Sequence, residues 1–286
     1  MSTFEIDFNS RNPGQFFACC GLLEMAERMW PGSEGEFLGS NSFRVTTPGS
    51  ESDPLNEIVQ KVATAAPLVG RTEDSSAFEN KEAKGATRYN IVPLLLLPSE
   101  PYSIRIDWWL KSSGAAQRSI SLWSGQQVLW APMSETDKTK EDKGTIIVLQ
   151  NALRQTFSKN KTGRDLLSFT YPASSRVGVD PTSSVKAIDA GFSPNEQSIT
   201  VQTSPATEIF ALIGFQGFRP LRNGEEFVYT LWSRRLPTII ARAAAGGAFG
   251  DKTSFKFKLA VRGECKSFGY AVPNTDEEET HNVHRQ

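Results

Sequence analysis

The sequence predicts an α+β fold, with helices packed on an antiparallel or mixed sheet. Segments of alternating polarity such as FEIDF (4–8), YSIRIDWWL (102–110) and SFKFKLAV (254–261) are typical of strands. Helical patterns separate them, and two of the helices open on a polar residue followed by proline, Asn12-Pro13 and Ser204-Pro205. The 286 residues can bury a core of one large domain or of two modest ones.

The first elements are set by capping and breaking residues. After the strand at 4–8, Asn12 is an N-cap, Pro13 fits the first helical position and Gln15 stands at the capping-box position, so we expect a helix to about Trp30. The segment 35–47 predicts a hairpin around a Gly-Ser-Asn-Ser turn. A second helix is expected from Pro54 to near Pro67.

The middle of the chain alternates regular and irregular segments. We expect exposed loops at 70–90 and 134–144, a helix at 146–157, and an irregular segment at 171–197 with a short helix around 182–189. Irregular segments of that length are typical of functional or disordered regions.

The last elements are a strand at 197–202, a helix from Pro205, a helix at 236–246, the turn GGAFGD and the strand at 254–261. The final residues, 276–286, carry four acidic residues against one arginine and predict a disordered acidic tail.

The hexapeptides FACCGL (17–22) and FALIGF (210–215) share the pattern FAxxG plus an apolar residue, each in a proline-started helix after a strand. This repeat leaves two domain organisations open: a single domain over 1–275, or two related and closely packed halves, 1–145 and 146–275. A shared need for a thin helix against a neighbour would also produce the pattern without any duplication.

Cys19 and Cys20 lie inside the first helix. At 100° per residue, Cys19 falls at the centre of the apolar face and Cys20 at its border. We therefore expect Cys19 to be a buried packing residue, and Ala18, Cys19 and Gly21 to form a thin patch that lets the helix approach a neighbour closely. Three cysteines without regular spacing fit a reducing compartment.

Histidine occurs at His281 and His284 alone, both in the tail. The body of the chain therefore cannot build a Ser-His-Asp triad, a Cys-His pair or a histidine zinc site. One enzyme-like pattern remains: Asp251, Glu264 and Lys266 loosely match the D…(E)xK arrangement of metal-dependent nucleases. We expect neither a catalytic site nor a cofactor, and keep the nuclease as an alternative.

Positive charge is concentrated between 205 and 266, where ten Lys/Arg stand against five Asp/Glu, a net +5. Aromatic residues interleave with these cations: Phe218, Tyr229, Trp232, Phe249, Phe255 and Phe257. Such a mixture predicts a nucleic-acid surface, because cations meet phosphates and aromatic rings stack on bases. The alternative is an ordinary solvated face over a core.

Several blocks of the chain resemble a known family. NPGQFFACCGLLEMAERMWPG, IRIDWWL with SLWSGQQ, SSRVGVDP…AGFSPNEQ, and EIFALIGFQGFRP with YTLW are similar to a Csb-type, large-subunit-like component of the subtype I-G (formerly I-U) CRISPR effector complex. The resemblance runs from about residue 4 to 270. It implies a Cascade-type complex in which this chain contacts CRISPR RNA, target double-stranded DNA or its flanking motif, the other Cascade-type subunits, and a helicase-nuclease. The chain is shorter than typical large subunits.

The resulting hypothesis is a non-catalytic, cytoplasmic nucleic-acid-binding subunit; the alternative is a structural adaptor that mainly contacts proteins. No hydrophobic run approaches the ~20 residues of a membrane span, and the N-terminus has no signal-peptide pattern, so we expect no membrane partner. Candidate nucleic-acid contacts are the cations Arg219, Arg222, Arg234, Arg235, Lys252, Arg176, Lys81, Lys84 and Arg88, with the amides Asn195 and Gln197 as base readers.

Overall fold

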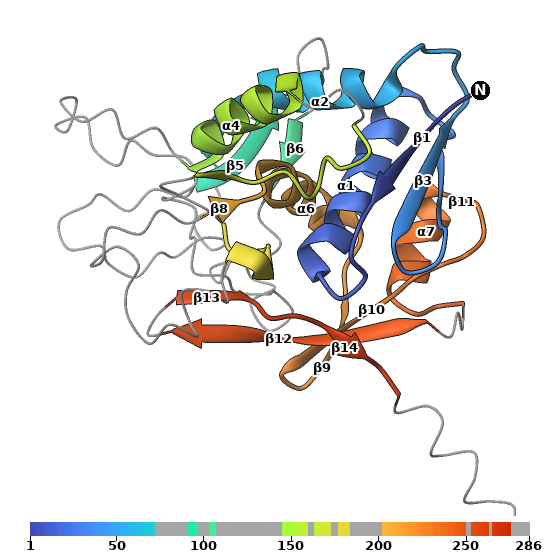
Figure 1. The fold of residues 1–286 in the computed structure, drawn as a ribbon, viewed down its shortest axis with the longest axis vertical. Coiled ribbons are helices and arrows are strands. Elements are labelled where there is room, and N and C mark those ends of the chain that lie inside the picture. Colours follow the sequence, from blue (N-terminus) through green and yellow to red (C-terminus); the bar gives the residue numbers. More distant parts are fainter. Residues whose placement is uncertain are drawn as a thin grey trace, which may run out of the picture.

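The computed structural model describes residues 1–71, 91–96, 103–106, 145–159, 163–172, 177–183, 202–249, 253–262 and 265–275. The expected loop at 134–144, the acidic tail at 276–286, and most of the expected loop at 70–90 and of the short helix at 182–189 lie outside these residues. The described part confirms the α+β class, with helices between antiparallel sheets (Figure 1).

The first sheet has the order β1-β3-β2-β11, with all neighbours antiparallel. Its strands are β1 (Ser2–Asp7), β2 (Glu34–Phe37), β3 (Ser42–Thr47) and β11 (Leu236–Pro237). The expected strand at 4–8 and hairpin at 35–47 are confirmed, whereas β11 comes from far along the chain and adds an edge to β2.

The second sheet has the order β13-β12-β10-β9, with β14 also paired to β12. Its strands are β9 (Leu221–Asn223), β10 (Glu226–Thr230), β12 (Ser254–Arg262), β13 (Cys265–Phe268) and β14 (Val272–Pro273). The strand expected at 254–261 is confirmed as β12. The other four strands were not predicted. Of these, β9, β13 and β14 are too short to show a period of two.

Two smaller sheets complete the strands. One has the order β4-β5-β6, formed by β4 (Ala66–Arg71), β5 (Ile91–Leu96) and β6 (Ser103–Arg105). The other pairs β7 (Tyr171–Pro172) with β8 (Gln202–Thr203). The described parts of the strands expected at 102–110 and 197–202 are thus short.

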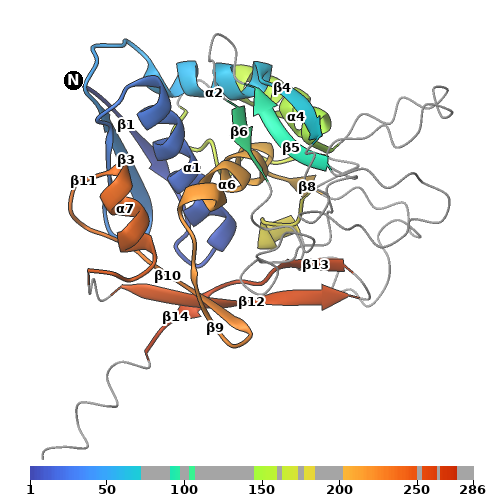
Figure 2. The same cartoon turned by 180° about the vertical axis from the view of Figure 1, so that it is seen from behind.

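The helices are α1 (Pro13–Met29), α2 (Pro54–Thr64), α4 (Thr145–Lys159), α6 (Pro205–Gly217) and α7 (Thr238–Ala245). All five were expected. The predicted limits of α1, α2, α4 and α7, and the predicted start of α6, lie within a few residues of these. α1 and α6 lie at the centre, with α2 and α4 at one end of the molecule and the second sheet at the other (Figures 1 and 2). None of the helices in the described ranges has both the length and the apolar composition needed to cross a membrane.

The start of α1 follows the sequence prediction except in one detail. The Asn12 side chain accepts a hydrogen bond from the Gln15 amide at 3.1 Å, as an N-cap does. A capping box would place the Gln15 side chain on the Asn12 amide, but Gln15 Oε1 accepts from the Asn9 amide at 2.7 Å. The Asn12 amide donates to the Asn9 carbonyl instead. This amide is the donor that a capping box would bind, and here it is already used by the turn before the helix.

Both cysteines of α1 are fully buried. Cys19 was expected to be buried; the border position expected for Cys20 is wrong. Residues 13–26 are all buried because α1 contacts the first sheet, α2, α6 and α7 together, so it has no solvent face over these turns. Burial raises the pKa of both thiols well above the ordinary value. These are packing residues, without the thiolate that reactive cysteines need.

The two FAxxG hexapeptides meet at the crossing of α1 and α6. A Cβ on Gly21 would overlap the carbonyl oxygen of Phe210, and a Cβ on Gly214 would overlap the carbonyl oxygen of Phe17. In each helix the glycine of one motif therefore faces the phenylalanine backbone of the other. The close approach expected from the thin patch of α1 is confirmed, and its neighbour is the second copy of the pattern.

Candidate nucleic-acid interface

The segment 218–235 leaves the C-terminal end of α6 and carries four of the predicted nucleic-acid contacts. Arg219, Arg222, Arg234 and Arg235 are all exposed. α6 places the start of this segment, since the Phe218 amide caps the helix by donating to the Gly214 carbonyl at 2.8 Å. Pairing of β9 with β10 then turns the chain back toward the core.

The aromatic residues between these arginines do not form a stacking surface. Of the aromatics expected to interleave with the cations, Phe249 is exposed and the rest are buried: Phe218, Tyr229, Trp232, Phe255 and Phe257. Tyr229 stacks on Phe16, and its hydroxyl donates to the Ser10 carbonyl at 2.5 Å. The stacking interpretation is therefore wrong for these five residues. Tyr229 on β10 and Phe255 and Phe257 on β12 face inward by strand alternation, and Phe218 and Trp232, which lie outside these strands, are buried as well.

Contacts hold two of the four arginines in defined places. Arg222 Nε donates to the Gly224 carbonyl at 3.0 Å, and its guanidinium lies 5.7 Å from the centre of the Phe227 ring. Arg235 Nε lies 3.8 Å from Glu36 Oε1 on β2. Arg222 thus belongs to the edge of the second sheet and Arg235 lies beside the first sheet.

The remaining predicted contacts lie outside the described residues: Lys81, Lys84, Arg88, Arg176, Asn195, Gln197 and Lys252. The same holds for Asp251 and Glu264 of the nuclease alternative. Lys266 lies in β13, but its side chain is not described. Within the described ranges, no group of three or more His, Cys, Asp or Glu side chains is placed to hold a metal ion.

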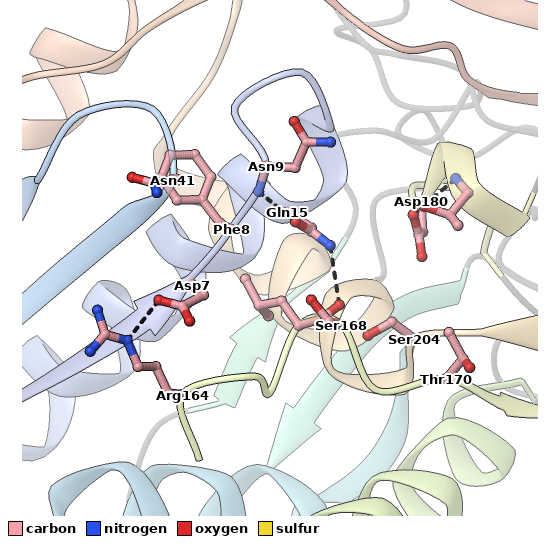
Figure 3. Close-up of a pocket in the computed structure, with 12 residues that line it drawn as sticks. Asp7, Phe8, Asn9, Gln15, Asn41, Arg164, Ser168, Thr170, Asp180 and Ser204 are labelled. Atoms are coloured by element: carbon pink, nitrogen blue, oxygen red, sulfur yellow. Dashed lines mark hydrogen bonds and ion pairs between the residues drawn. The ribbon is translucent and has the colours of Figure 1, made fainter. Parts of the chain in front are cut away.

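A polar cleft of about 620 Å³ lies at the N-terminal ends of α1 and α6 (Figure 3). Its wall is formed by Asp7, Phe8, Asn9, Gln15, Asn41, Arg164, Leu167, Ser168, Thr170, Asp180, Thr182 and Ser204. Sequence reasoning did not select this cleft. Two signals pointed toward it: the polar caps Asn12 and Ser204, and the irregular segment 171–197, which contains Asp180.

The two helix starts share one backbone acceptor in the floor of the cleft. Gln15 Nε2 and Thr207 Oγ1 both donate to the Leu167 carbonyl, at 3.2 and 3.0 Å. Gln15 and Thr207 hold the same position, three residues after the cap, in α1 and in α6. The loop around Leu167 therefore fixes the two N-termini side by side.

The loop 177–180 crosses both helix starts and binds a buried carboxylate. Glu208 of α6 accepts hydrogen bonds from the amides of Val177, Gly178 and Asp180 at 2.7, 2.9 and 3.2 Å. Burial, and then the negative charge of Asp180, raise the pKa of Glu208 to about 7, although the three amide bonds act in the opposite direction. Its ionisation near neutral pH is thus coupled to the loop.

The charged groups of the cleft are engaged in structural contacts. Arg164 Nε donates to Asp7 Oδ1 at 2.7 Å, and this hydrogen bond raises the pKa of Arg164. Asp180 Oδ1 accepts from Asn12 Nδ2 at 2.9 Å and from the Thr182 amide at 3.1 Å. The exposed hydroxyls of Ser168 and Thr170 leave the cleft able to hydrogen-bond a polar group, and we assign it no reaction.

Comparison with known proteins gives no match: no family model matches the chain, and neither a curated protein nor a solved structure does. Function is therefore inferred from this chain's own residues and from the resemblance described above.

Proposed function

We propose that the protein is a non-catalytic, nucleic-acid-binding subunit of a CRISPR RNA-guided surveillance complex of the subtype I-G kind. Its nucleic-acid partners are the CRISPR RNA and the target double-stranded DNA, and its protein partners are the other Cascade-type subunits and a helicase-nuclease. In such complexes base pairing reads the sequence, while protein cations hold the backbone.

The observation that carries this proposal is that the arginines and the aromatic residues of the segment 218–235 differ in exposure. Its four arginines are exposed, while its aromatic residues, Phe218, Phe227, Tyr229 and Trp232, are buried. Exposed guanidinium groups without exposed rings suit phosphate contact, which carries no sequence information, better than base stacking. A subunit that holds a guide or duplex backbone needs this kind of surface.

The test is a salt titration of binding to a guide-length RNA and to duplex DNA, with wild type, Arg219→Gln, Arg222→Gln and the double variant. Removing one cation that binds a phosphate lowers the slope of log K against log salt by about 0.9 on duplex and about 0.7 on single strands. We expect the double variant to lower the slope by about twice these amounts and to weaken binding to all sequences alike.

Lys61→Gln supplies the charge-matched control, because Lys61 lies on α2 at the other end of the molecule from β9 (Figure 1). It should leave the slope unchanged. Equal slopes for wild type and the double variant would contradict the proposal and favour the structural adaptor. Mg²⁺-dependent cleavage by wild type that is lost in Asp251→Ala would instead favour the nuclease.

A further inference from the structure

The segment 177–183 forms a strap between the starts of α1 and α6 and the second sheet (Figures 1 and 2). Its Gly178 carbonyl accepts a hydrogen bond from the Phe268 amide of β13 at 2.9 Å. Its Asp180 side chain accepts from Asn12 Nδ2, at the start of α1, at 2.9 Å. The strap is thus held by elements that lie far apart in the sequence.

The strap forms part of one wall of the polar cleft. Asp180 and Thr182 line the cleft, and the side chains of Val177 and Val179 are buried (Figure 3). A Cβ on Gly14 would overlap the Val179 carbonyl oxygen, so the strap lies directly on the first turn of α1. Displacement of the strap would therefore open the cleft on this side and uncover the start of α1.

Glu208 of α6 is the ionisable side chain that binds the strap, and it is 0 % exposed. Its two oxygens have different partners. Oε2 accepts from the amides of Val177 and Gly178 at 2.7 and 2.9 Å, whereas Oε1 accepts only from the Asp180 amide, at 3.2 Å. Two short bonds to one oxygen and a single long bond to the other suit a carbonyl oxygen at Oε2 and leave room for a proton on Oε1.

The groups around Glu208 leave a negative charge on it unbalanced. Asp180 of the strap is the charged group that acts on it, and its charge has the same sign. Arg164, a cation in the wall of the cleft, is paired with Asp7 instead. The neighbouring elements bring uncharged groups to this place: Asn12 and Gln15 from α1, Leu167 from its loop and Phe268 from β13. Within the described part of the chain, ionised Glu208 is therefore stabilised by the strap amides and by no cation.

We propose that the strap 177–183 is a pH-sensitive closure of the polar cleft, which Glu208 holds most firmly when it is protonated and which loosens as Glu208 ionises beside Asp180. The pKa of Glu208 is about 7 with the strap closed, and with the strap displaced it returns toward the ordinary 4.5, because the carboxyl then meets water. Proton binding therefore favours the closed state. Closure is strongest below pH 4.5 and weakens as pH rises through 7. This device goes beyond the nucleic-acid contacts of the proposed function and does not depend on them.

Amide hydrogen exchange of the full-length chain, with each rate corrected for the intrinsic exchange of that amide, measures how often the strap opens. With pKa values of about 7 and 4.5, the opening equilibrium constant of the strap should rise about tenfold between pH 6 and pH 8. Glu208→Gln keeps an uncharged side chain of the same size and should abolish this rise. Thr207→Val is the matched control, because it leaves the carboxyl in place and should show the same rise as wild type.

Asp180→Asn gives a second test that does not alter Glu208. It removes the like charge, so the rise between pH 6 and pH 8 should become smaller than in wild type. An opening constant of the strap that does not change with pH in wild type would overturn the proposal, and so would an equal rise in Glu208→Gln. Strap amides that exchange only as slowly as the core amides of α1 would overturn it as well, because Glu208 would then act on global unfolding alone.

Discussion

α1 and α6 begin alike and cross at matching glycines, yet their ends are built differently. At the N-terminus, α6 carries the buried carboxylate Glu208, whereas α1 has Phe16 at the same distance from its cap. At the C-terminus, α1 ends in ion pairs between Glu24, Arg28 and Arg242, whereas α6 leads into the exposed arginines. The glycines in the middle of both helices serve the same close packing at the crossing. The features in which the two helices differ, the buried carboxylate, the ion pairs and the exposed arginines, lie at their ends.

The largest effect is expected where the two helices are alike. Gly21→Ala and Gly214→Ala each place a methyl group on a carbonyl oxygen of the facing helix, and backbone cannot yield as a flexible side chain can. We expect each to lower the free energy of unfolding by about 3 kcal/mol, the upper end of the range for overpacked cores. Chemical denaturation followed by circular dichroism measures the change.

The double variant tests whether the crossing is a single shared contact. Once one alanine has pushed the helices apart, the second should cost less, so the double variant should be more stable than the sum of the singles predicts. Gly246→Ala is the control: its nearest atoms lie at 3.6 and 3.7 Å from the added carbon and its φ is negative, so it should change stability by under about 0.5 kcal/mol. Full additivity would show that the two glycines act independently.

The second-largest effect on stability is expected from Glu208, the buried carboxylate that α6 has at its start and α1 lacks. The pKa of Glu208 is about 7 in the folded protein and 4.5 for an ordinary glutamate, so between these values the native state binds the extra proton. Its contribution to stability is therefore greatest in acid and is lost as pH rises through 7. Between pH 4.5 and pH 7 and just above, the free energy of unfolding should fall by at most roughly 3 kcal/mol from this group.

Glu208→Gln removes this dependence. The stability difference between wild type and variant should be largest near pH 5 and should narrow by up to about 3 kcal/mol by pH 8, as measured by urea unfolding at each pH. Thr207→Val is the control, because it lies one residue away and carries no charge. Its free energy of unfolding should differ from that of wild type by the same amount at pH 5 and at pH 8. A difference that does not change with pH would mean that Glu208 is ionised throughout.

The sequence predicted the helices well because their limits are local. Asn12, Asp53 and Ser204 each cap a helix that continues with proline, and the side chain of each accepts the amide three residues on. The burial of Cys20 was not predictable from the phase of α1, because α6 and α7, which come from about 200 residues later in the chain, pack on this helix, and Arg242 of α7 pairs with Glu24. Tertiary packing overrode the local pattern.

In the candidate sites, too, features visible in the local sequence were predicted and features that depend on tertiary packing were not. The arginines of 218–235 were predicted from the distribution of charge in the sequence. The aromatic residues of the same region were wrongly predicted to be exposed: β10 and β12 turn Tyr229, Phe255 and Phe257 inward, and Phe218 and Trp232 are buried by packing outside these strands. The polar cleft was not found at all. It joins Asp7, Arg164, Asp180 and Ser204, whose proximity depends on the crossing of α1 and α6.

The smallest effect concerns the acceptor that the two helix starts share. Thr207→Val removes one donor to the Leu167 carbonyl and Gln15→Leu removes the other, so each alone leaves the carbonyl with one partner and should cost about 1 kcal/mol. Together they leave a buried carbonyl unpaired, and the double variant should exceed the sum by about 1 kcal/mol in a double-mutant cycle. Strict additivity would mean that α1 and α6 are fixed separately, and that the loop around Leu167 does not couple the two N-termini.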